Sequence, residues 1–276
     1  MEDFLLLEMP IFKPKYKKWK RYGYANAEEK KNLKVALEKS TGGYCMYCFS
    51  RIKVDQKLFA NLEHAIEKGN SDKLVECIPN IGLSCTLCNQ TFKRIGERKR
   101  KLSDKMVRQY EENSKCSVEN RKQCTIACKE LRRLQKSYSG LPGAEIILQP
   151  MGIKGSDSGE ELALQYNVLN MIFEPAKGRH TYSDKELNFI DTHINRFRLN
   201  DSQYRTRQLY DFVQNVIDSN GKIPMYEYNN LIVQLFCEKL SGKSSEEIVK
   251  ICESIYLIMF PKMQDISPAE KTVISK

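Results

Sequence analysis

"YCMYC" at residues 44–48 and "SCTLCNQTFK" at residues 84–93 are the stretches that decide how the central part of this chain folds. Each contains a Cys-x-x-Cys motif, and together they contribute Cys45, Cys48, Cys85 and Cys88. Four thiolates are a ligand set that tetrahedral zinc takes in structural sites. Because such a set leaves no open coordination position, the sequence predicts a structural Zn²⁺ that clamps two segments around an insert.

The composition is that of a globular protein with a basic surface. The chain has 276 residues, of which 41% are hydrophobic and 29% are charged. This balance excludes a disordered chain and allows one or two domains. Lys and Arg number 45 against 35 Asp and Glu, which gives a net charge of +10. That excess favours a polyanionic partner such as DNA, because neutralising phosphates releases counterions.

The apolar run at the beginning of the sequence is too short to cross a membrane. It carries Glu2, Asp3 and Glu8, and it lacks both a basic leading segment and a small-residue cleavage site. We therefore expect neither a signal peptide nor a membrane anchor. The sequence predicts a cytoplasmic protein, in which thiols stay reduced and paired cysteines bind metal rather than form disulfides.

The segment between the two Cys-x-x-Cys motifs, here called knuckles, and the residues after the second knuckle carry side chains suited to hydrolysis. A neutral imidazole at His64 can take a proton from water, so we expect it to be the general base. The carboxylate of Glu63 and the amide oxygen of Asn89 would suit a catalytic Mg²⁺ or Mn²⁺. Asn80 is placed to orient His64 through the other imidazole nitrogen. Expected phosphate-binding residues are Lys93, Arg94 and Arg98.

Each of these residues also has a simple structural explanation. A histidine before an apolar pair can pack in the core or lie on the surface, and Asn89 can serve the turn after Cys88, since Asn tolerates left-handed backbone. Their joint spacing favours a phosphodiester hydrolase. Two alternatives remain open. One is a zinc-stapled nucleic-acid-binding or scaffold module that does not cut, and the other is a junction-resolving or recombination nuclease.

"YCMYC", "LEHAIEK" and "NIGLSCTLCNQTFK" together resemble the HNH endonucleases, in particular the zinc-stapled subset in which Asn replaces the final His. The resemblance implies a ββα-metal core with His64 as base, Glu63 and Asn89 as ligands of the catalytic cation, and Asn80 as the orienting residue. The sequence departs from that pattern in two places. Glu63 stands where many members have Asp, and no proline follows His64 closely.

A weaker resemblance extends over residues from about 10 to 210, through "IILQP", "YNVLNMIFEPAKG" and "THINRFRLNDSQYRTRQ". These segments look like the HNH subunit of Septu-type and retron-associated antiphage defence systems. That similarity implies an AAA/ABC-type ATPase partner and, in the retron case, a reverse transcriptase with its RNA-DNA. It also implies a nuclease effector that is restrained until phage infection.

Residues 10–24, "PIFKPKYKKWKRYGY", alternate lysines with aromatic residues. Such a segment can stack on bases and neutralise phosphates. Alternatively, its aromatics pack on the protein body while the lysine ammonium groups stay in water. Trp19 is the only tryptophan and would be a large anchor, so we expect it to pack.

The fold class that we expect is α+β and mainly helical. Three regions are predicted: a basic arm and helix at 1–40, a ββα-metal nuclease module with structural zinc at 41–100, and a mostly helical region at 101–276 that docks a partner. The first helix begins near Asn26 and ends before Gly42. Short strands precede His64, a basic helix starts at "CNQTFKRIGERKRKL", a strand is predicted at 144–153 and a strand pair at 162–175.

The remaining cysteines suggest a second question. Cys124 and Cys128 are one helical turn apart if that segment is helical, and with Cys116 they would offer three sulfur atoms to a second metal or a redox response. Small buried residues on an amphipathic helix are the simpler interpretation, and the one that we favour. His180 and His193 have no ligand-like neighbours, so we expect surface or structural roles for them.

Overall fold

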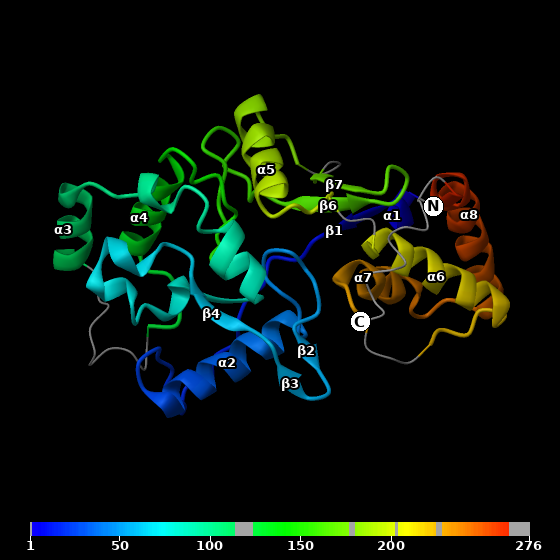
Figure 1. The fold of residues 1–276 in the computed structure, drawn as a ribbon, viewed down its shortest axis with the longest axis horizontal. Helices are drawn as coiled ribbons and strands as arrows, with labels where there is room; N and C mark the ends of the chain where they lie inside the picture. Colours follow the sequence, from blue (N-terminus) through cyan, green and yellow to red (C-terminus); the bar gives the residue numbers. More distant parts are fainter. Residues whose placement is uncertain (1, 114–123, 177–179, 202–203, 225–227, 265–276) are drawn as a thin grey trace. The chain divides into compact units, whose positions relative to one another are not determined.

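The structure is a computed structural model that describes residues 2–113, 124–176, 180–201, 204–224 and 228–264 (Figure 1). Over these residues it is α+β, with eight α-helices and three small antiparallel sheets. Contacts divide the chain into two compact units. The helical unit comprises Met1–Met9, Leu164–Glu174 and Arg198–Lys276, and the knuckle unit comprises Pro10–Ala163 and Pro175–Phe197.

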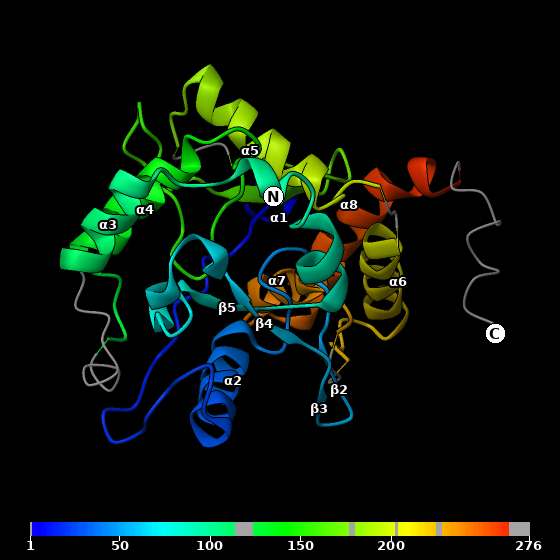
Figure 2. The ribbon, with the colours of Figure 1, turned by 60° about the vertical axis from the view of Figure 1, so that its left-hand side comes forward.

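The knuckle unit combines short strands with separate helices. Its strands are β2 (Lys53–Val54), β3 (Lys57–Leu58), β4 (Asn61–His64) and β5 (Ile81–Ser84). Its helices are α2 (Ala27–Thr41), α3 (Asp104–Asn113), α4 (Lys129–Ser139) and α5 (Asp184–Arg196), with a π-helical turn at Cys88–Phe92. β2 pairs with β3 and β4 pairs with β5, both antiparallel. Figure 2 shows β4 and β5 beside α2.

Helix α2 confirms the predicted beginning and end of the first helix. The side-chain oxygen of Asn26 accepts hydrogen bonds from the backbone N–H groups of Glu28 and Glu29, which satisfies donors that the first turn leaves free. Gly42 ends the helix in the left-handed conformation, with φ of 61°. The buried face carries Leu33 and Leu37, and the helix packs against β5.

The predicted basic helix after Cys88 is wrong as a continuous element. The π-helical turn stops at Phe92, Gly96 has φ of 73°, and only a 3-10 turn follows at Glu97–Lys99. A residue in that left-handed region interrupts helical hydrogen bonding, and glycine adopts it at little cost. The strand predicted at 144–153 is also absent from the structure of that segment, which is buried without pairing into a sheet.

Residues 10–24 confirm one half of the packing expectation and contradict the other. Phe12 and Tyr22 are buried, as aromatic residues that pack on the body should be. Trp19, which we expected to be the anchor, is instead 78% exposed. The segment therefore has a buried aromatic side and an exposed tip.

The helical unit contains a three-stranded sheet and most of the predicted C-terminal helices. The sheet order is β1 (Leu6–Glu8), β6 (Leu164–Asn167) and β7 (Ile172–Pro175), which confirms the predicted strand pair. The helices are α1 (Glu2–Leu5), α6 (Tyr204–Asp218), α7 (Leu231–Leu240) and α8 (Ser245–Gln264). α6 packs against α8 and α7 (Figure 1). No helix in the described parts of the chain is long and apolar enough to span a membrane.

Candidate functional site

The four knuckle cysteines converge on one point in the knuckle unit. Their sulfur atoms all lie within 4.8 Å of one another, and the Sγ atoms of Cys48 and Cys85 are 3.8 Å apart. A tetrahedron with Zn–S bonds of about 2.3 Å has edges of about 3.8 Å, so the observed separation suits zinc. Three of the four residues are buried, and Cys85 is half-buried. The cluster thus confirms the predicted grouping of Cys45, Cys48, Cys85 and Cys88.

Backbone geometry fixes the sulfur atoms in place. The backbone N–H of Cys85 donates to the sulfur of Cys45 at 3.3 Å, and that of Cys88 donates to the sulfur of Cys85 at 3.4 Å. Burial raises the pKa of the Cys45 thiol, while hydrogen bonds from neighbouring thiols lower the pKa of Cys48. A divalent cation among the four would stabilise all of them as thiolates. The donor set therefore fits structural zinc and would hold it without an open position.

Glu63 lies on β4 in a buried ion pair. Its Oε1 pairs with the ammonium group of Lys93, and its Oε2 accepts a hydrogen bond of 2.6 Å from the hydroxyl of Tyr47. The Lys93 ammonium also donates to the carbonyl oxygens of His64 and Ala65. The side chains of Glu63 and Lys93 are 3% and 4% exposed. Both carboxylate oxygens thus already have partners.

His64, the next residue of β4, has a different set of partners. Its Nε2 lies 3.0 Å from the carbonyl oxygen of Val75, and its ring meets the ring of Tyr24 edge-on at 4.7 Å. Since a carbonyl oxygen can only accept, Nε2 carries the proton and Nδ1 has the free lone pair. Burial lowers the pKa of His64 below its ordinary 6.5, so the imidazole is neutral at pH 7.

The expected convergence of Glu63, His64 and Asn89 on one cation is not what the structure shows. Successive residues of a strand point to opposite faces, which sends the carboxylate of Glu63 toward Lys93 and the imidazole of His64 toward Tyr24. Both oxygens of Glu63 are used. As these side chains lie, they do not fit a Mg²⁺ or Mn²⁺ site.

Asn80 does not orient His64 by the predicted direct contact. Its Oδ1 accepts from the backbone N–H of Ile66 at 2.8 Å, and its Nδ2 donates to the carbonyl oxygen of Ile66 at 2.9 Å. The amide therefore acts as a two-bond clamp between the ends of β4 and β5. The His64 ring is held instead by Val75.

The three predicted phosphate-binding residues divide into two groups. Lys93 is buried against Glu63, so it is not available to a phosphate, and that prediction is wrong. Arg94 and Arg98 are exposed, and neither forms an ion pair within the described residues. Asn89 is half-buried in the π-helical turn, one turn before Lys93, with its backbone N–H bonded to the carbonyl oxygen of Cys85 at 3.1 Å.

A cationic and aromatic group beside His64 escaped the sequence analysis. The ammonium groups of Lys30 and Lys68 lie 4.6 and 5.3 Å from the centre of the Tyr24 ring. The backbone N–H of Tyr24 donates to Glu76 at 2.7 Å. Glu76 follows the residue that holds His64, so one short segment positions both rings. The alternation of lysines with aromatic residues at 10–24 was the one sequence signal that pointed toward this arrangement.

Arg100 is a second residue whose role the sequence concealed. It belongs to "ERKRK" at 97–101, a run that suggests a solvated surface or a phosphate contact, yet Arg100 is only 1% exposed. Its guanidinium pairs with Glu67 at 2.8 Å and donates to the hydroxyl of Tyr138 at 2.8 Å and to the carbonyl oxygen of Lys93. It ties the segment after the second knuckle to α4 and to the residues after β4.

The second cysteine site, the alternative that we did not favour, receives no support from the described residues. The favoured interpretation, small buried residues on a helix, is wrong for Cys128, which is half-buried and lies just before α4. Cys116 lies outside them. Cys128 serves as the N-cap of α4, where its sulfur accepts from the backbone N–H of Leu131. The knuckle cluster is the group of metal-ligating side chains found in the described part of the chain. His193, expected to be surface or structural, is buried and accepts from the backbone N–H of Ile147 through Nδ1 at 3.0 Å.

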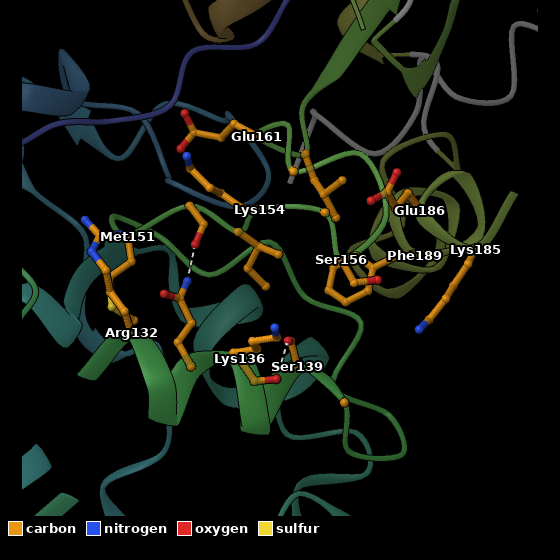
Figure 3. A pocket seen from close by; sticks show the side chains of 17 residues that line it. Arg132, Lys136, Ser139, Met151, Lys154, Ser156, Glu161, Lys185, Glu186 and Phe189 are labelled. Carbon is orange, nitrogen blue, oxygen red and sulfur yellow. Dashed lines mark hydrogen bonds between the residues drawn. The ribbon is translucent and has the colours of Figure 1, made fainter. Parts of the chain in front are cut away.

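The knuckle unit also contains a cavity of about 550 Å³ that no sequence motif predicted (Figure 3). Met151, Ile153, Leu162 and Phe189 give it apolar walls, between α4, α5 and the segment 151–162. Four exposed cationic side chains surround it, and none has an ion-pair partner among the described residues: Arg132, Lys136, Lys154 and Lys185. Its size and lining are typical of small-molecule sites.

Comparisons of the chain with models of protein families, with characterised proteins and with solved structures found no match. The residues, their geometry and the motif resemblance described above are therefore what bear on the function.

Proposed function

We propose that this chain is a zinc-stapled endonuclease that hydrolyses phosphodiester bonds in DNA, with His64 as its general base. The observation that supports this most is the state of the imidazole. The Val75 carbonyl fixes the proton on Nε2, and burial keeps the ring neutral, so Nδ1 can accept a proton at pH 7. The four-cysteine cluster would hold the zinc that fixes this part of the fold.

The proposed reaction needs one water molecule and one phosphodiester. His64 Nδ1 takes a proton from the water, and the resulting hydroxide attacks phosphorus. The bond from phosphorus to the leaving oxygen breaks, and that oxygen takes up a proton from solvent to give an alcohol and a phosphate monoester, while His64 returns its proton to solvent. The ammonium groups of Lys30 and Lys68 lie 4.6 and 5.3 Å from the centre of the Tyr24 ring, which meets the His64 ring, and they would bind phosphate oxygens.

A Mg²⁺ or Mn²⁺ ion belongs to this proposal only if Lys93 withdraws from Glu63. The ion pair occupies the carboxylate that the resemblance assigns to the metal. No step above depends on such an ion. Cleavage in the presence of a chelator that leaves zinc bound, compared with cleavage in added Mg²⁺ or Mn²⁺, decides this part of the proposal.

The test of the proposed function is plasmid nicking by the full chain and by His64→Ala. We expect the substitution to lower the cleavage rate by a factor of about 10²–10⁴, which is the usual contribution of a general base. His180→Ala is the matched control, because His180 pairs with Glu160 away from β4. Cleavage that survives in a folded, zinc-bound His64→Ala protein would remove His64 as the base.

A second candidate function is a zinc-stapled module that binds nucleic acid without cutting it. The buried pair of Glu63 with Lys93 favours this candidate, because it fills the position that a catalytic cation would need. Binding of DNA without nicking under any divalent cation would establish it. The motif resemblance alone supports the remaining part of the proposal, namely an antiphage role with an ATPase partner. The plasmid assay should therefore be repeated with the product of the neighbouring gene.

A further inference from the structure

The tip of the N-terminal segment is a hydrogen-bonded turn that leaves Trp19 in solvent. The backbone N–H of Lys20 donates to the carbonyl oxygen of Lys17 at 3.1 Å, which closes the turn around Lys18 and Trp19. The backbone N–H of Lys17 donates to the hydroxyl of the buried Tyr22 at 2.8 Å. The buried Tyr22 therefore anchors the beginning of the turn to the body of the knuckle unit.

Helix α2 supports the same turn from a third side. Asn32 accepts from the ammonium of Lys20 through Oδ1 and donates to the carbonyl oxygen of Arg21 through Nδ2, both at 3.2 Å. Beneath the tip, the rings of Tyr16 and Tyr22 meet edge-on at 4.9 Å. These contacts hold the turn with its largest apolar side chain, Trp19, 78% exposed.

The exposed indole belongs to a basic turn. The ammonium of Lys17 lies 5.4 Å from the centre of the Trp19 ring, and Lys18 and Arg21, close in sequence, are exposed. An exposed aromatic face in a basic segment is the combination that stacks on unpaired bases while neutralising the backbone phosphates. An exposed tryptophan contributes little to folding stability, because most of its apolar surface stays in water as it does in the unfolded chain.

We propose that this turn, residues 17–21, binds single-stranded nucleic acid by stacking one base on Trp19. The inference goes beyond the proposed function by naming the form of nucleic acid and its contact. The turn is close to the proposed site along the chain. Trp19 and Tyr24 are five residues apart, so their Cα atoms are separated by at most about 17 Å. Tyr24 contacts His64, and a few nucleotides would cover that distance.

The test uses the fact that Trp19 is the only tryptophan, so its fluorescence reports on this contact alone. Full-length His64→Ala protein, which removes the complication of cleavage, is titrated with a dT oligonucleotide of about 12 nucleotides without added metal. We expect quenching of the Trp19 emission and an affinity that falls several-fold or more between 50 and 200 mM salt. A duplex of the same length should bind more weakly, because its bases are not free to stack.

Variants then separate stacking from charge. In anisotropy titrations with a labelled oligonucleotide, Trp19→Ala should bind about ten-fold more weakly, and Trp19→Phe should recover part of the loss. Phe59→Ala, which removes another exposed aromatic of the same unit, should leave the affinity unchanged. Equal affinity of Trp19→Ala and the parent, absent quenching, or equal affinity for the duplex would each overturn the proposal.

One further arm tests a membrane surface as the partner. Vesicles containing phosphatidylserine should leave the Trp19 emission unchanged; an emission shift with vesicles and none with the oligonucleotide would overturn the proposal in favour of a lipid surface. The outcome is independent of the nuclease assay. Binding with quenching but without plasmid cleavage would refute the proposed function alone, and cleavage without quenching would refute this inference alone.

Discussion

The four-cysteine cluster and strand β4 lie in the same unit, but side chains that are close in sequence converge in the cluster and diverge in the strand. In each knuckle, two residues separated by three positions turn toward one point, so four sulfur atoms come within 4.8 Å of one another. In β4, the adjacent Glu63 and His64 turn apart and acquire unrelated partners. The comparison teaches that adjacency in a strand separates side chains, whereas a tight turn brings them together.

The largest loss of stability should come from removing one thiolate of the four-cysteine cluster, where the side chains converge. Cys85→Ser removes one of four thiolates, and we expect the chain to lose its bound zinc and the fold of the knuckle unit. Structural zinc sites contribute about 10–16 kcal/mol of apparent binding free energy in zinc-finger peptides. Elemental analysis should show one zinc per parent chain and none in the variant, and the far-UV circular dichroism of the variant should lose the part of the thermal transition that belongs to the knuckle unit.

The matched control for that experiment is Cys237→Ser. Cys237 is a half-buried residue of α7 and has no part in the cluster, so this variant should keep its zinc and its transition. A Cys85→Ser protein that folds normally without metal would mean that the four thiols are only part of the apolar core.

The second prediction concerns strand β4, where Glu63 turns away from His64 to pair with Lys93. Lys93→Met leaves the carboxylate of Glu63 buried without its cationic partner, and breaking such a pair costs about 3–5 kcal/mol. Urea denaturation followed by circular dichroism at pH 7 measures the change. Arg94→Met, at the exposed next position, should change the free energy of unfolding by no more than about 0.5 kcal/mol.

Two additions make the Lys93 experiment sharper. The double variant Glu63→Gln with Lys93→Met should recover most of the lost stability, because no buried charge remains. Stabilisation of Lys93→Met by Mn²⁺, with no effect on the parent, would show that Glu63 accepts a divalent cation once the ammonium is gone. If Lys93→Met costs nothing, the ion pair described here does not form in solution.

The smallest expected effect is a pH dependence of stability that comes from His193, which packs near Glu63 on one side of β4. The ring of His193 lies against Tyr47, the partner of Glu63, and burial lowers its pKa to about 3. The unfolded chain, with an ordinary pKa near 6.5, binds a proton that the folded chain does not bind. Stability is therefore complete above pH 6.5 and falls as the pH is lowered from 6.5 toward 3.

Between pH 7.5 and 5.5 this histidine should cost the parent about 1.4 kcal/mol of unfolding free energy. His193→Gln keeps an acceptor for the backbone N–H of Ile147 but does not titrate. Its free energy of unfolding should therefore fall by about 1.4 kcal/mol less over the same range. Identical pH profiles for the two proteins would mean that His193 is protonated in the folded state.

Local signals made much of the fold predictable. Asn26 and Gly42 marked the ends of α2, and the strand pair predicted at 162–175 is present as β6 and β7. The grouping of the cysteines was equally predictable. Two residues at a fixed spacing within a turn have few arrangements available, so the motif determines the geometry.

The remaining features depend on contacts between distant parts of the chain. "ERKRK" gives no sign that Arg100, rather than its neighbours, turns inward to Glu67 and Tyr138. Lys93 appeared to be one more cation of a basic run, and its ammonium lies instead between three oxygen atoms of β4 and the residue after it. Choosing the buried lysine or arginine in a basic run requires knowledge of which carboxylate faces it.

The solvent-facing position of the single tryptophan has a practical consequence for anyone who follows the unfolding of this protein by its emission. An indole that is already wetted in the native state changes its surroundings little when the chain denatures, so that signal would underreport the transition. Ring contacts within the interior, such as Tyr47 stacked on Phe197 at 4.8 Å, make near-ultraviolet dichroism of tyrosine the more informative probe.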